Sequence, residues 1–450
     1  MIELRSEEQS LAVGIIEGEK IMLSFDGSFS VEGGGRTFSG TAMASADGDG
    51  VMLGTESGTV VHAKEITLTP VDPRKNSFLV YDVVIGKNFH WERTEHQRFR
   101  GSLKVIRTGR NVQAINVVGI EEYLLSVISS EMSAEAPFEF LKAQAVASRS
   151  WLVAQLQFSR DRKAGSAARP PSVLHEPGRM IRWYDREDHA LFDVCADDHC
   201  QRYQGMTKAG TPVVAEAVAA TRGRVLTYEG RVCDARFSKS CGGISELYES
   251  AWDPEHHGYL VPVRDAEGES LPDLTREDLA ERWIRSSPPS FCRVEDPNLA
   301  RRILPTVDQE TTDSYRWSIE IPQDELNTRL REKTGVDFGG IISLNPVRRG
   351  SSGRIVELRI MGKSSTLTIG KELEIRRVLS ATHLPSSAFV VDDRGRAGDL
   401  PERFILMGAG WGHGVGLCQI GAGVMGERGF TADQILRHYF QGAVIERLYQ

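Results

Sequence analysis

The chain has 450 residues, of which 40% are hydrophobic and 26% charged, and its formal net charge is −8 at pH 7. This composition is ordinary for a globular protein of two or three domains, and the negative charge excludes nucleic acid held by bulk electrostatics. No run reaches the roughly 18–20 apolar residues of a membrane span, and six cysteines are too few for a disulfide scaffold.

The first residues, MIELRSEEQSLAV, lack the basic and then apolar layout of a secretory signal, so either export is absent or the signal is not part of this chain. Residues 13–104 alternate in short runs broken by Gly, Asp-Gly and Pro, which predicts strands and hairpins. No cluster of nucleophiles, bases or metal ligands appears there. Residues 1–100 are therefore predicted to form a small β-rich accessory module.

Helical periodicity follows, with one helix expected near 120–132 and a second from about Phe138 to Leu156. Glu131 closes the first helix on the side that should face the core. A carboxylate is rarely buried unless it is paired or catalytic, so Glu131 is a candidate catalytic acid.

The second helix carries Gln144, Ser148 and Arg149 beside an apolar face. A polar strip of this kind suits a groove that binds hydroxyl-rich ligands. A solvated side of the helix explains Gln144 alone equally well.

The stretch HALFDVCADDHCQRYQG places two histidines and two cysteines within twelve positions. These residues are His189, Cys195, His199 and Cys200. Two imidazoles and two thiolates complete a tetrahedral zinc site, which favours a structural role because no position stays open for water. A Cys195–Cys200 disulfide, or free cysteines with surface histidines, is the alternative.

Two further stretches are rich in glycine. In RFSKSCGGISE, Ser240 and Cys241 precede the pair Gly242 and Gly243, which predicts either a backbone-lined binding turn or an ordinary hairpin end.

In GAGWGHGVGLCQIGAGVMG, alternate glycines predict an extended segment with one face free of side chains and with Trp411 and His413 on the other. Another backbone or a flat ligand could approach the bare face closely. Gln419 follows on a helix of small residues that could pack tightly against a neighbour.

Strand runs and helix runs come in blocks rather than as regular βα units, which predicts an α+β fold. The pattern TADQ at 431–434 predicts a capping box that opens the last helix. Residues 101–450 are predicted to form one catalytic domain of mixed strands and helices, preceded by the β-rich module.

Together these stretches resemble the stage II sporulation protein D family, which includes the amidase-enhancer proteins. The resemblance runs from about residue 105 to 450 and weakens over 266–345. It rests on the blocks IEEYLLSVISSEMSAEAPFEFLKAQAVASRSW, FDVCADDHCQRYQG, AVAATRGRVLTYEGRVCDARFSKSCGGISE, SGRIVELRI and GWGHGVGLCQIGAGVMGERGFTADQILRHYFQG. Cys241 and Cys418 depart from it, since relatives commonly have serine there.

The resemblance implies a lytic transglycosylase that acts on peptidoglycan glycan strands, preferably strands whose stem peptides an amidase has removed. The catalytic acid of the family corresponds to Glu131. Its zinc ligands, where a metal is present, correspond to His189, Cys195, His199 and Cys200. The substrate places the protein outside the cytoplasm, in the cell wall or periplasm.

Such an enzyme cleaves the β-1,4 bond between N-acetylmuramic acid and N-acetylglucosamine with one carboxylic acid, and the C6 hydroxyl of the muramic acid attacks to give a 1,6-anhydro end. The apolar helix face would keep Glu131 protonated, and no cofactor is required for the chemistry. The predicted glycan contacts are Gln144, Arg149, Ser240, Gly242, Gly243, His413 and Gln419. The alternatives are a non-catalytic glycan-binding protein that stimulates a cell-wall amidase, and a zinc hydrolase centred on residues 189–200.

Overall fold

The computed structural model describes the chain except residues 1–6, 34, 56–57, 59, 88–91, 164–171, 184–188, 198, 209–210, 269, 306–308 and 310–312. The described part forms two compact units. The N-terminal unit comprises residues 2–134, 188–224 and 447–450, and the C-terminal unit comprises 135–187 and 225–446. Both contain helices and strands, so the fold is α+β as predicted. The compact units are defined by contacts and combine segments from several parts of the chain, so they do not test a domain boundary at residue 100, which stays a prediction.

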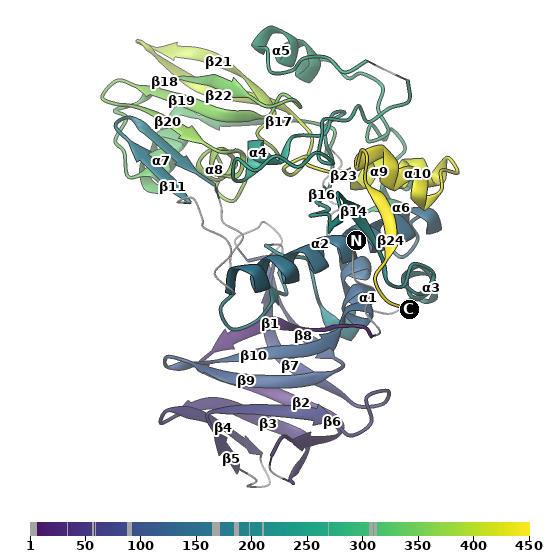
Figure 1. The fold of residues 1–450 in the computed structure, drawn as a ribbon. Coiled ribbons are helices and arrows are strands. Elements are labelled where there is room, and N and C mark those ends of the chain that lie inside the picture. The colour runs from purple at the N-terminus through teal and green to yellow at the C-terminus, as the bar shows by residue number, and fades with distance from the viewer. Residues whose placement is uncertain are drawn as a thin grey trace. The chain divides into compact units, whose positions relative to one another are not determined.

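The N-terminal unit is built on an eleven-stranded sheet, which confirms the β-rich pattern of its first hundred residues (Figure 1). The sheet has the order β13-β1-β10-β9-β6-β2-β3-β4-β5, and β7 joins β2 to β8. Its strands are β1 (Ser10–Gly18), β2 (Lys20–Val31), β3 (Thr37–Asp47), β4 (Gly50–Thr55), β5 (Val60–Ala63), β6 (Glu65–Pro70), β7 (Ser77–Ile85), β8 (Arg93–Phe99), β9 (Ser102–Thr108), β10 (Asn111–Gly119) and β13 (Val194–Cys195).

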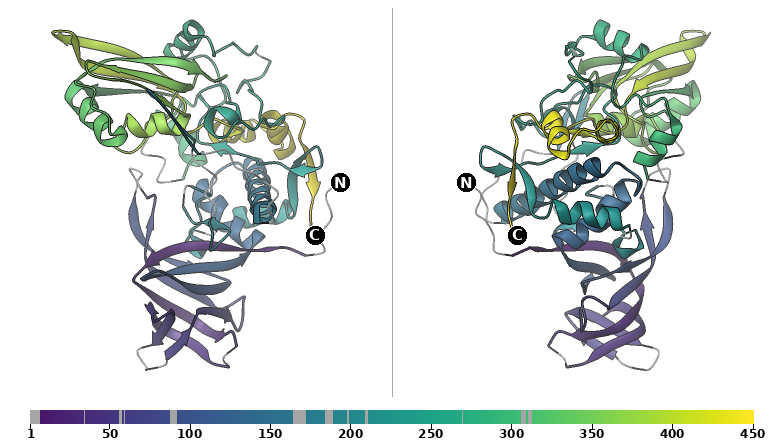
Figure 2. Two further views of the ribbon diagram at one scale, coloured as in Figure 1. Left: turned by 60° about the vertical axis from the view of Figure 1, so that its left-hand side comes forward. Right: turned by 90° about the vertical axis from the view of Figure 1, so that its right-hand side faces the viewer.

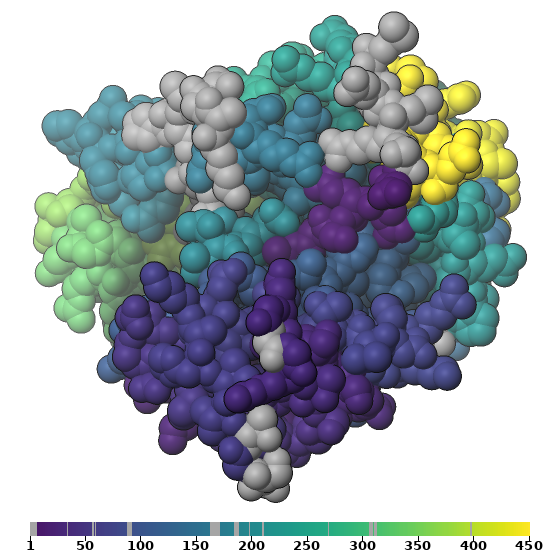
Figure 3. Space-filling model, turned by 60° about the horizontal axis from the view of Figure 1, so that its bottom comes forward, coloured from purple at the N-terminus to yellow at the C-terminus, as the bar shows by residue number. Residues whose placement is uncertain are grey.

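This sheet curls so that its strands overlap in two layers (Figure 2), with their outer surface drawn in purple in Figure 3. Buried phenylalanines on the strands of this sheet contact one another. They are Phe25, Phe29, Phe38, Phe78 and Phe99. The alternation of apolar and polar residues that predicts the strands is the pattern that buries one face of each.

Three short helical elements complete this unit. They are α1 (Ile120–Glu131), η1 (Gly205–Thr207) and α3 (Pro212–Ala220). Helix α1 buries Leu124, Val127 and Ile128 and ends at Glu131, where the following residue adopts an extended conformation. The predicted limits of this helix are confirmed within one residue.

The described part of the C-terminal unit combines a long helix with one five-stranded sheet, two three-stranded sheets and one pair of strands. The helix is α2 (Phe138–Lys163). One sheet has the order β11 (Val173–Glu176), β12 (Arg179–Arg182), β20 (Thr366–Gly370), β19 (Ile355–Gly362) and β18 (Ile341–Arg349). A second has the order β17 (Arg316–Pro322), β22 (Leu400–Ala409) and β21 (Phe389–Ala397).

Helices α7 (Gln323–Thr334) and α8 (Glu372–Val378) lie side by side against these strands (Figure 1). Leu326 and Leu330 of α7 and Ile375 of α8 join one apolar core with residues from both sheets. This core holds the strands on which the loops of the candidate site are mounted.

The remaining elements of the unit are short. They are α4 (Tyr248–Ala251), α5 (Glu277–Arg285), α6 (Pro297–Ile303), the sheet β15 (Arg231–Val232), β14 (Arg224–Tyr228) and β24 (Val444–Arg447), the pair β16 (Phe237–Ser238) and β23 (Leu417–Cys418), and helices α9 (Gln419–Glu427) and α10 (Ala432–Tyr439). Thr431 and Gln434 form the predicted capping box of α10. No helix of the described residues is long and apolar enough to cross a membrane.

Candidate functional site

Glu131 is the last residue of α1 and is half-buried. Its Oε1 atom accepts a hydrogen bond from the backbone N–H of Arg202 at 3.1 Å. A backbone N–H can only donate, so Oε1 is held as an acceptor. With Oε1 as the accepting oxygen, we assign the proton of the neutral carboxyl group to Oε2.

The segment that supplies this N–H contacts α1 and the neighbouring strand β10 at other points as well. The backbone N–H of Gln204 donates to Ser126 Oγ at 2.9 Å. The ring of Tyr203 stacks on Tyr123 with centroids 4.9 Å apart, and its hydroxyl donates to Asn116 at 2.6 Å. These contacts fix residues 202–204 against β10 and against the helix that ends in Glu131.

The Tyr123 hydroxyl is buried and has no hydrogen-bond partner among the described residues. Burial raises the pKa of Tyr123 well above its usual range, and the Cys200 and Cys195 thiolates and, more weakly, Glu131 add to the effect. Tyr123 therefore stays neutral between the cysteines and the candidate acid.

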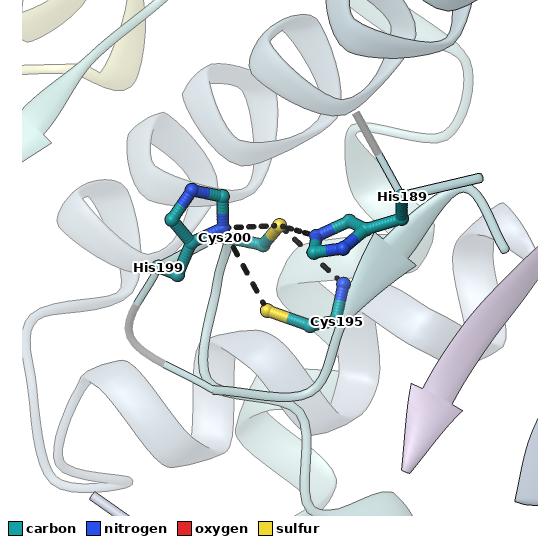
Figure 4. Close-up of side chains that lie close together, drawn as sticks. All are labelled: His189, Cys195, His199 and Cys200. Carbon is teal, nitrogen blue, oxygen red and sulfur yellow. Dashed lines mark hydrogen bonds between the residues drawn. The ribbon is translucent and has the colours of Figure 1, made fainter. Parts of the chain in front are cut away.

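The four predicted metal ligands come together in one cluster, the His-Cys cluster of His189, Cys195, His199 and Cys200. Their ligand atoms all lie within 4.8 Å of one another. Cys200 Sγ is 3.4 Å from His189 Nε2 and 3.4 Å from His199 Nδ1. Figure 4 shows the four side chains turned toward one centre.

These distances fit a tetrahedral zinc ion. A sulfur at about 2.3 Å and a nitrogen at about 2.0–2.1 Å from zinc are about 3.6 Å apart across a tetrahedron. The Cys195 Sγ to His199 Nδ1 distance of 3.9 Å is close to this value as well. The hydrogen bond from Cys200, with weaker ones from the two imidazoles, lowers the pKa of the Cys195 thiol against the effect of burial. The two cysteines do not form a disulfide with each other.

The N-terminal strands position this cluster. Val194 and Cys195 pair in parallel with Val13 and Gly14 of β1. Asp197 accepts hydrogen bonds from the backbone N–H groups of Gly86 and Lys87 at 3.1 Å each. The β-rich region predicted to be an accessory module thus holds the loop that carries the metal ligands.

A buried arginine organises the predicted glycan-contact loops of the C-terminal unit. Arg354 is fully buried, and its guanidinium donates to the carbonyls of Gly412 at 3.0 Å and Cys241 at 3.1 Å. Weaker or additional bonds reach the Ser240 carbonyl and Ser352 Oγ. Arg354 therefore ties the glycine loop, residues 410–416, to the Ser-Cys turn, residues 240–243.

The expectation that the glycine loop is extended is wrong. Its four glycines all have positive φ, between 74° and 91°. The close approach predicted there is confirmed, because a Cβ on Gly414 would lie 2.4 Å from Arg354 Cζ and one on Gly416 would lie 2.1 Å from the Arg236 carbonyl oxygen. Glycine is needed both for the left-handed backbone and for this contact.

The Ser-Cys turn pairs with the glycine loop through backbone hydrogen bonds between Ser240 and Trp411, at 3.1 and 2.8 Å. Gly242 and Gly243 have φ of 78° and 107°. A Cβ on Gly242 would meet the backbone of Gly410 at 2.8 Å. The turn is thus built for close packing of two backbones, and Ser240 is fully buried within it.

His413 stands among aromatic and cationic side chains. Its ring meets Trp252 edge-on with centroids 4.8 Å apart, and Arg236 lies 4.4 Å from the Trp252 ring. Its Nδ1 accepts the N–H of Val415 at 3.0 Å. Burial, followed by the charges of Arg236 and Arg354, lowers the pKa of His413 well below its usual range. The imidazole is therefore neutral.

The other predicted glycan contacts are buried. Gln144 and Arg149 are fully buried on α2, and Gln419 is 5% exposed at the start of α9. Within the described chain, Gln144 Oε1, Ser240 Oγ and Gln419 Nε2 are buried without hydrogen-bond partners. Buried polar atoms of this kind need a water molecule or a ligand to satisfy them.

Arg354 and Trp252 were not predicted as functional residues. The block SGRIVELRI contains Arg354, but only the fold shows that its guanidinium reaches two loops more than fifty residues away. Trp252 has no motif of its own in the sequence. Its signal is spatial, because it lies beside His413.

Comparison with known families identifies the region that contains Glu131 and the His-Cys cluster. Residues 108–228 match the model of a family described as stage II sporulation protein. This part of the chain is therefore similar to the stage II sporulation proteins. Residues 246–416 match a second family, which is described only as a domain of unknown function.

Known relatives extend the similarity beyond this domain. The stage II sporulation protein D of Bacillus amyloliquefaciens is 26% identical over 345 residues, which cover 76% of this chain and 78% of the relative. The protein of the same name from Bacillus subtilis is 25% identical over 346 residues, with the same coverage. A Bacillus subtilis protein named amidase enhancer is 22% identical over 339 residues, which are 72% of this chain and 40% of that relative.

Proposed function

We propose that this protein is a lytic transglycosylase that acts on peptidoglycan glycan strands outside the cytoplasm. It cleaves the β-1,4 bond between N-acetylmuramic acid and N-acetylglucosamine and leaves 1,6-anhydro ends. The observation that carries the proposal is the placement of Glu131 at the end of α1, with Oε1 held by the N–H of Arg202. The similarity to the stage II sporulation proteins supports a role in the cell wall.

In this mechanism Glu131 first acts as the acid. Its Oε2 proton passes to the glycosidic oxygen as the bond to the muramic acid C1 breaks. The C6 hydroxyl of the same sugar then attacks C1 and returns its proton to Glu131, which restores the acid. One carboxyl group serves both steps because water does not enter the reaction, whereas hydrolytic glycosidases use two carboxylates.

Zinc, in this proposal, is structural. His189, Cys195, His199 and Cys200 would hold it, and four protein ligands leave no position for a reacting water. Arg202 comes two residues after Cys200, so the ion would fix the backbone that orients Glu131. This argues against the zinc-hydrolase alternative.

The loops of the C-terminal unit are proposed to bind the glycan. His413 and Trp252 offer a neutral imidazole and an indole face on which a sugar ring can stack, and both are partly exposed. Ser240 and Gln419 have polar atoms without a partner within the described chain, and they stay predicted contacts. Gln144, Arg149, Gly242 and Gly243 also stay predicted contacts; Gln144, Arg149 and Ser240 are fully buried, so they would reach a glycan only if the residues that cover them move. Glycan strands freed of peptides by an amidase suit such contacts, because they expose the sugar faces.

The test compares wild type, Glu131→Gln and the control Glu122→Gln on strands freed of stem peptides. Glu122 lies on the same helix and pairs with Arg100. General acid catalysis contributes about 10²–10⁴-fold, so Glu131→Gln should lose at least about a hundredfold in rate while glycan binding persists. Glu122→Gln should stay active.

The alternative is a glycan-binding protein that stimulates an amidase without cleaving the strand, and the name of the amidase enhancer relative favours it. If this alternative holds, the immobilised protein would retain glycan strands on a column, yet neither the wild type nor either variant would release a soluble fragment. Full activity of Glu131→Gln would instead remove Glu131 from the mechanism.

A further inference from the structure

Three cysteines and an aspartate from distant parts of the sequence meet in the interior of the C-terminal unit. They are Cys241, Asp265, Cys292 and Cys418, named here the Cys-Asp cluster. Their ligand atoms all lie within 4.8 Å of one another, and each residue is at most 2% exposed. None of them belongs to the His-Cys cluster. We propose that the Cys-Asp cluster is a second, structural zinc site.

The distances suit a single ion. Cys241 Sγ lies 3.8 Å from Cys292 Sγ. Two sulfurs at about 2.3 Å from a tetrahedral zinc are also about 3.8 Å apart. A disulfide requires about 2.05 Å between the sulfurs, and all three cysteines are free.

Backbone N–H groups point at the sulfurs, as expected for thiolates. The N–H of Cys241 donates to Cys418 Sγ at 3.2 Å, and the N–H of Gly243 donates to Cys241 Sγ at 3.3 Å. The Gly242–Gly243 pair makes the second bond possible because its positive φ angles bring the N–H two residues on back toward the sulfur. A core cysteine that merely fills space needs no such donors.

The carboxylate has the supporting bonds of a metal ligand. Asp265 Oδ2 accepts from Ser290 Oγ and from the Cys292 N–H, at 2.8 Å each, and Oδ1 accepts from the Tyr439 hydroxyl at 2.6 Å. A ligating carboxylate is oriented by partners of this kind. No lysine or arginine of the described chain forms an ion pair with Asp265, so a cation at the sulfurs would offset the cost of burying its charge.

The cluster is closely packed on one side and lies near a surface pocket on another. A Cβ on Gly421 would lie 2.3 Å from Asp265 Oδ1, which explains why helix α9 is built of small residues there. Ser290 lines a surface pocket of about 370 Å³ together with Ala266 and Phe291. Ser290 also contacts Asp265 and Cys292, so it separates this pocket from the cluster by a single side chain.

The proposed ion joins three segments. Cys241 belongs to the Ser-Cys turn, and Cys418 follows the glycine loop and caps α9. Asp265 and Cys292 bring in the chain between them. Three thiolates and one carboxylate complete a zinc coordination shell, so the site stabilises these loops and does not activate water. The proposal does not depend on the transglycosylase assignment.

The test counts zinc in the full-length protein and in variants, by elemental mass spectrometry after purification without chelators. Wild type should hold two zinc ions per chain. Cys195→Ser/Cys200→Ser and Cys241→Ser/Cys418→Ser should each hold one. The matched control Cys233→Ser removes a buried cysteine outside both clusters and should keep two.

Cobalt(II) added to the Cys195→Ser/Cys200→Ser chain should give thiolate-to-cobalt charge-transfer bands. This assay leaves the Cys-Asp cluster itself unchanged. Absence of both metal and bands in this chain would overturn the proposal. A Cys241–Cys292 disulfide found by non-reducing peptide mapping would do the same. If the Cys241→Ser/Cys418→Ser chain does not fold, the zinc count of wild type and the cobalt spectrum still decide.

Discussion

Replacing Arg354 with methionine should destabilise the C-terminal unit, because it removes every donor of the guanidinium while keeping most of the side-chain volume. Arg354 is fully buried beneath the glycine loop. Four acceptors lose a hydrogen bond, and two of them, the carbonyls of Gly412 and Cys241, depend on Arg354 as their donor. The Ser240 carbonyl keeps its bond to Trp411.

The size of the effect follows from the orphaned carbonyls. A buried acceptor left without a donor costs about 1–3 kcal/mol, so two such carbonyls predict a loss of roughly 2–6 kcal/mol. Burial lowers the pKa of Arg354, which shows that its charge is desolvated, and removing that charge regains part of the loss. Glu246, also fully buried, then loses a nearby positive charge. The carbonyl and Glu246 terms outweigh the regained desolvation, and we expect a net loss of about 3 kcal/mol.

Urea unfolding followed by circular dichroism measures this change. With a slope of about 3 kcal/mol per molar urea, the transition of the C-terminal unit should move down by about 1 M. The matched control is Arg359→Met, which removes an exposed arginine from β19 and should leave the midpoint unchanged. An unchanged midpoint for Arg354→Met would refute the view that this guanidinium holds the two loops together.

Three further outcomes are expected. Cys200→Ser should lower bound zinc by one ion and speed hydrogen exchange at the Arg202 amide, because that amide lies two residues beyond the metal ligand. An unchanged exchange rate would contradict the link between the metal site and Glu131. Burial lowers the pKa of His383 from 6.5 to about 4. Its neutral form therefore stabilises the fold fully above about pH 6.5, and this stability is lost as the pH falls toward 4. His383→Gln should flatten the pH dependence of the unfolding midpoint between these values, and an equally steep curve would contradict the prediction. Trp252→Ala should weaken binding of peptide-free glycan by about five- to tenfold, the effect of losing roughly 1 kcal/mol of ring stacking, as measured by calorimetry with catalytically inactive protein.

Local patterns in the sequence predicted what local physics determines. The apolar spacing of α1 placed Glu131 at its last residue, and the capping box of α10 formed as expected. The His-Cys cluster also formed, because all four ligands lie within twelve positions of one loop. Bringing together residues that are so close in sequence costs little loop-closure entropy.

Contacts between distant segments were beyond the same reasoning. The glycine loop was predicted to be extended because alternate glycines resemble a strand, but its positive φ angles serve the approach of Arg354, which lies just before β19. The Cys-Asp cluster spans residues 241–418, and nothing in its spacing marks it. The pairing of Cys195 with the first strand gave the N-terminal region a role that composition alone did not indicate.

The most direct test of the central claim is the product formed by the wild-type protein in water enriched in oxygen-18. Glycan strands freed of peptides are digested, and the new ends are analysed by mass spectrometry beside Glu131→Gln. A transglycosylase uses the C6 hydroxyl of the sugar, so the account predicts ends that are one water lighter than reducing ends and carry no heavy oxygen, and predicts almost none from Glu131→Gln. Reducing ends that contain oxygen-18 would show hydrolysis and contradict it.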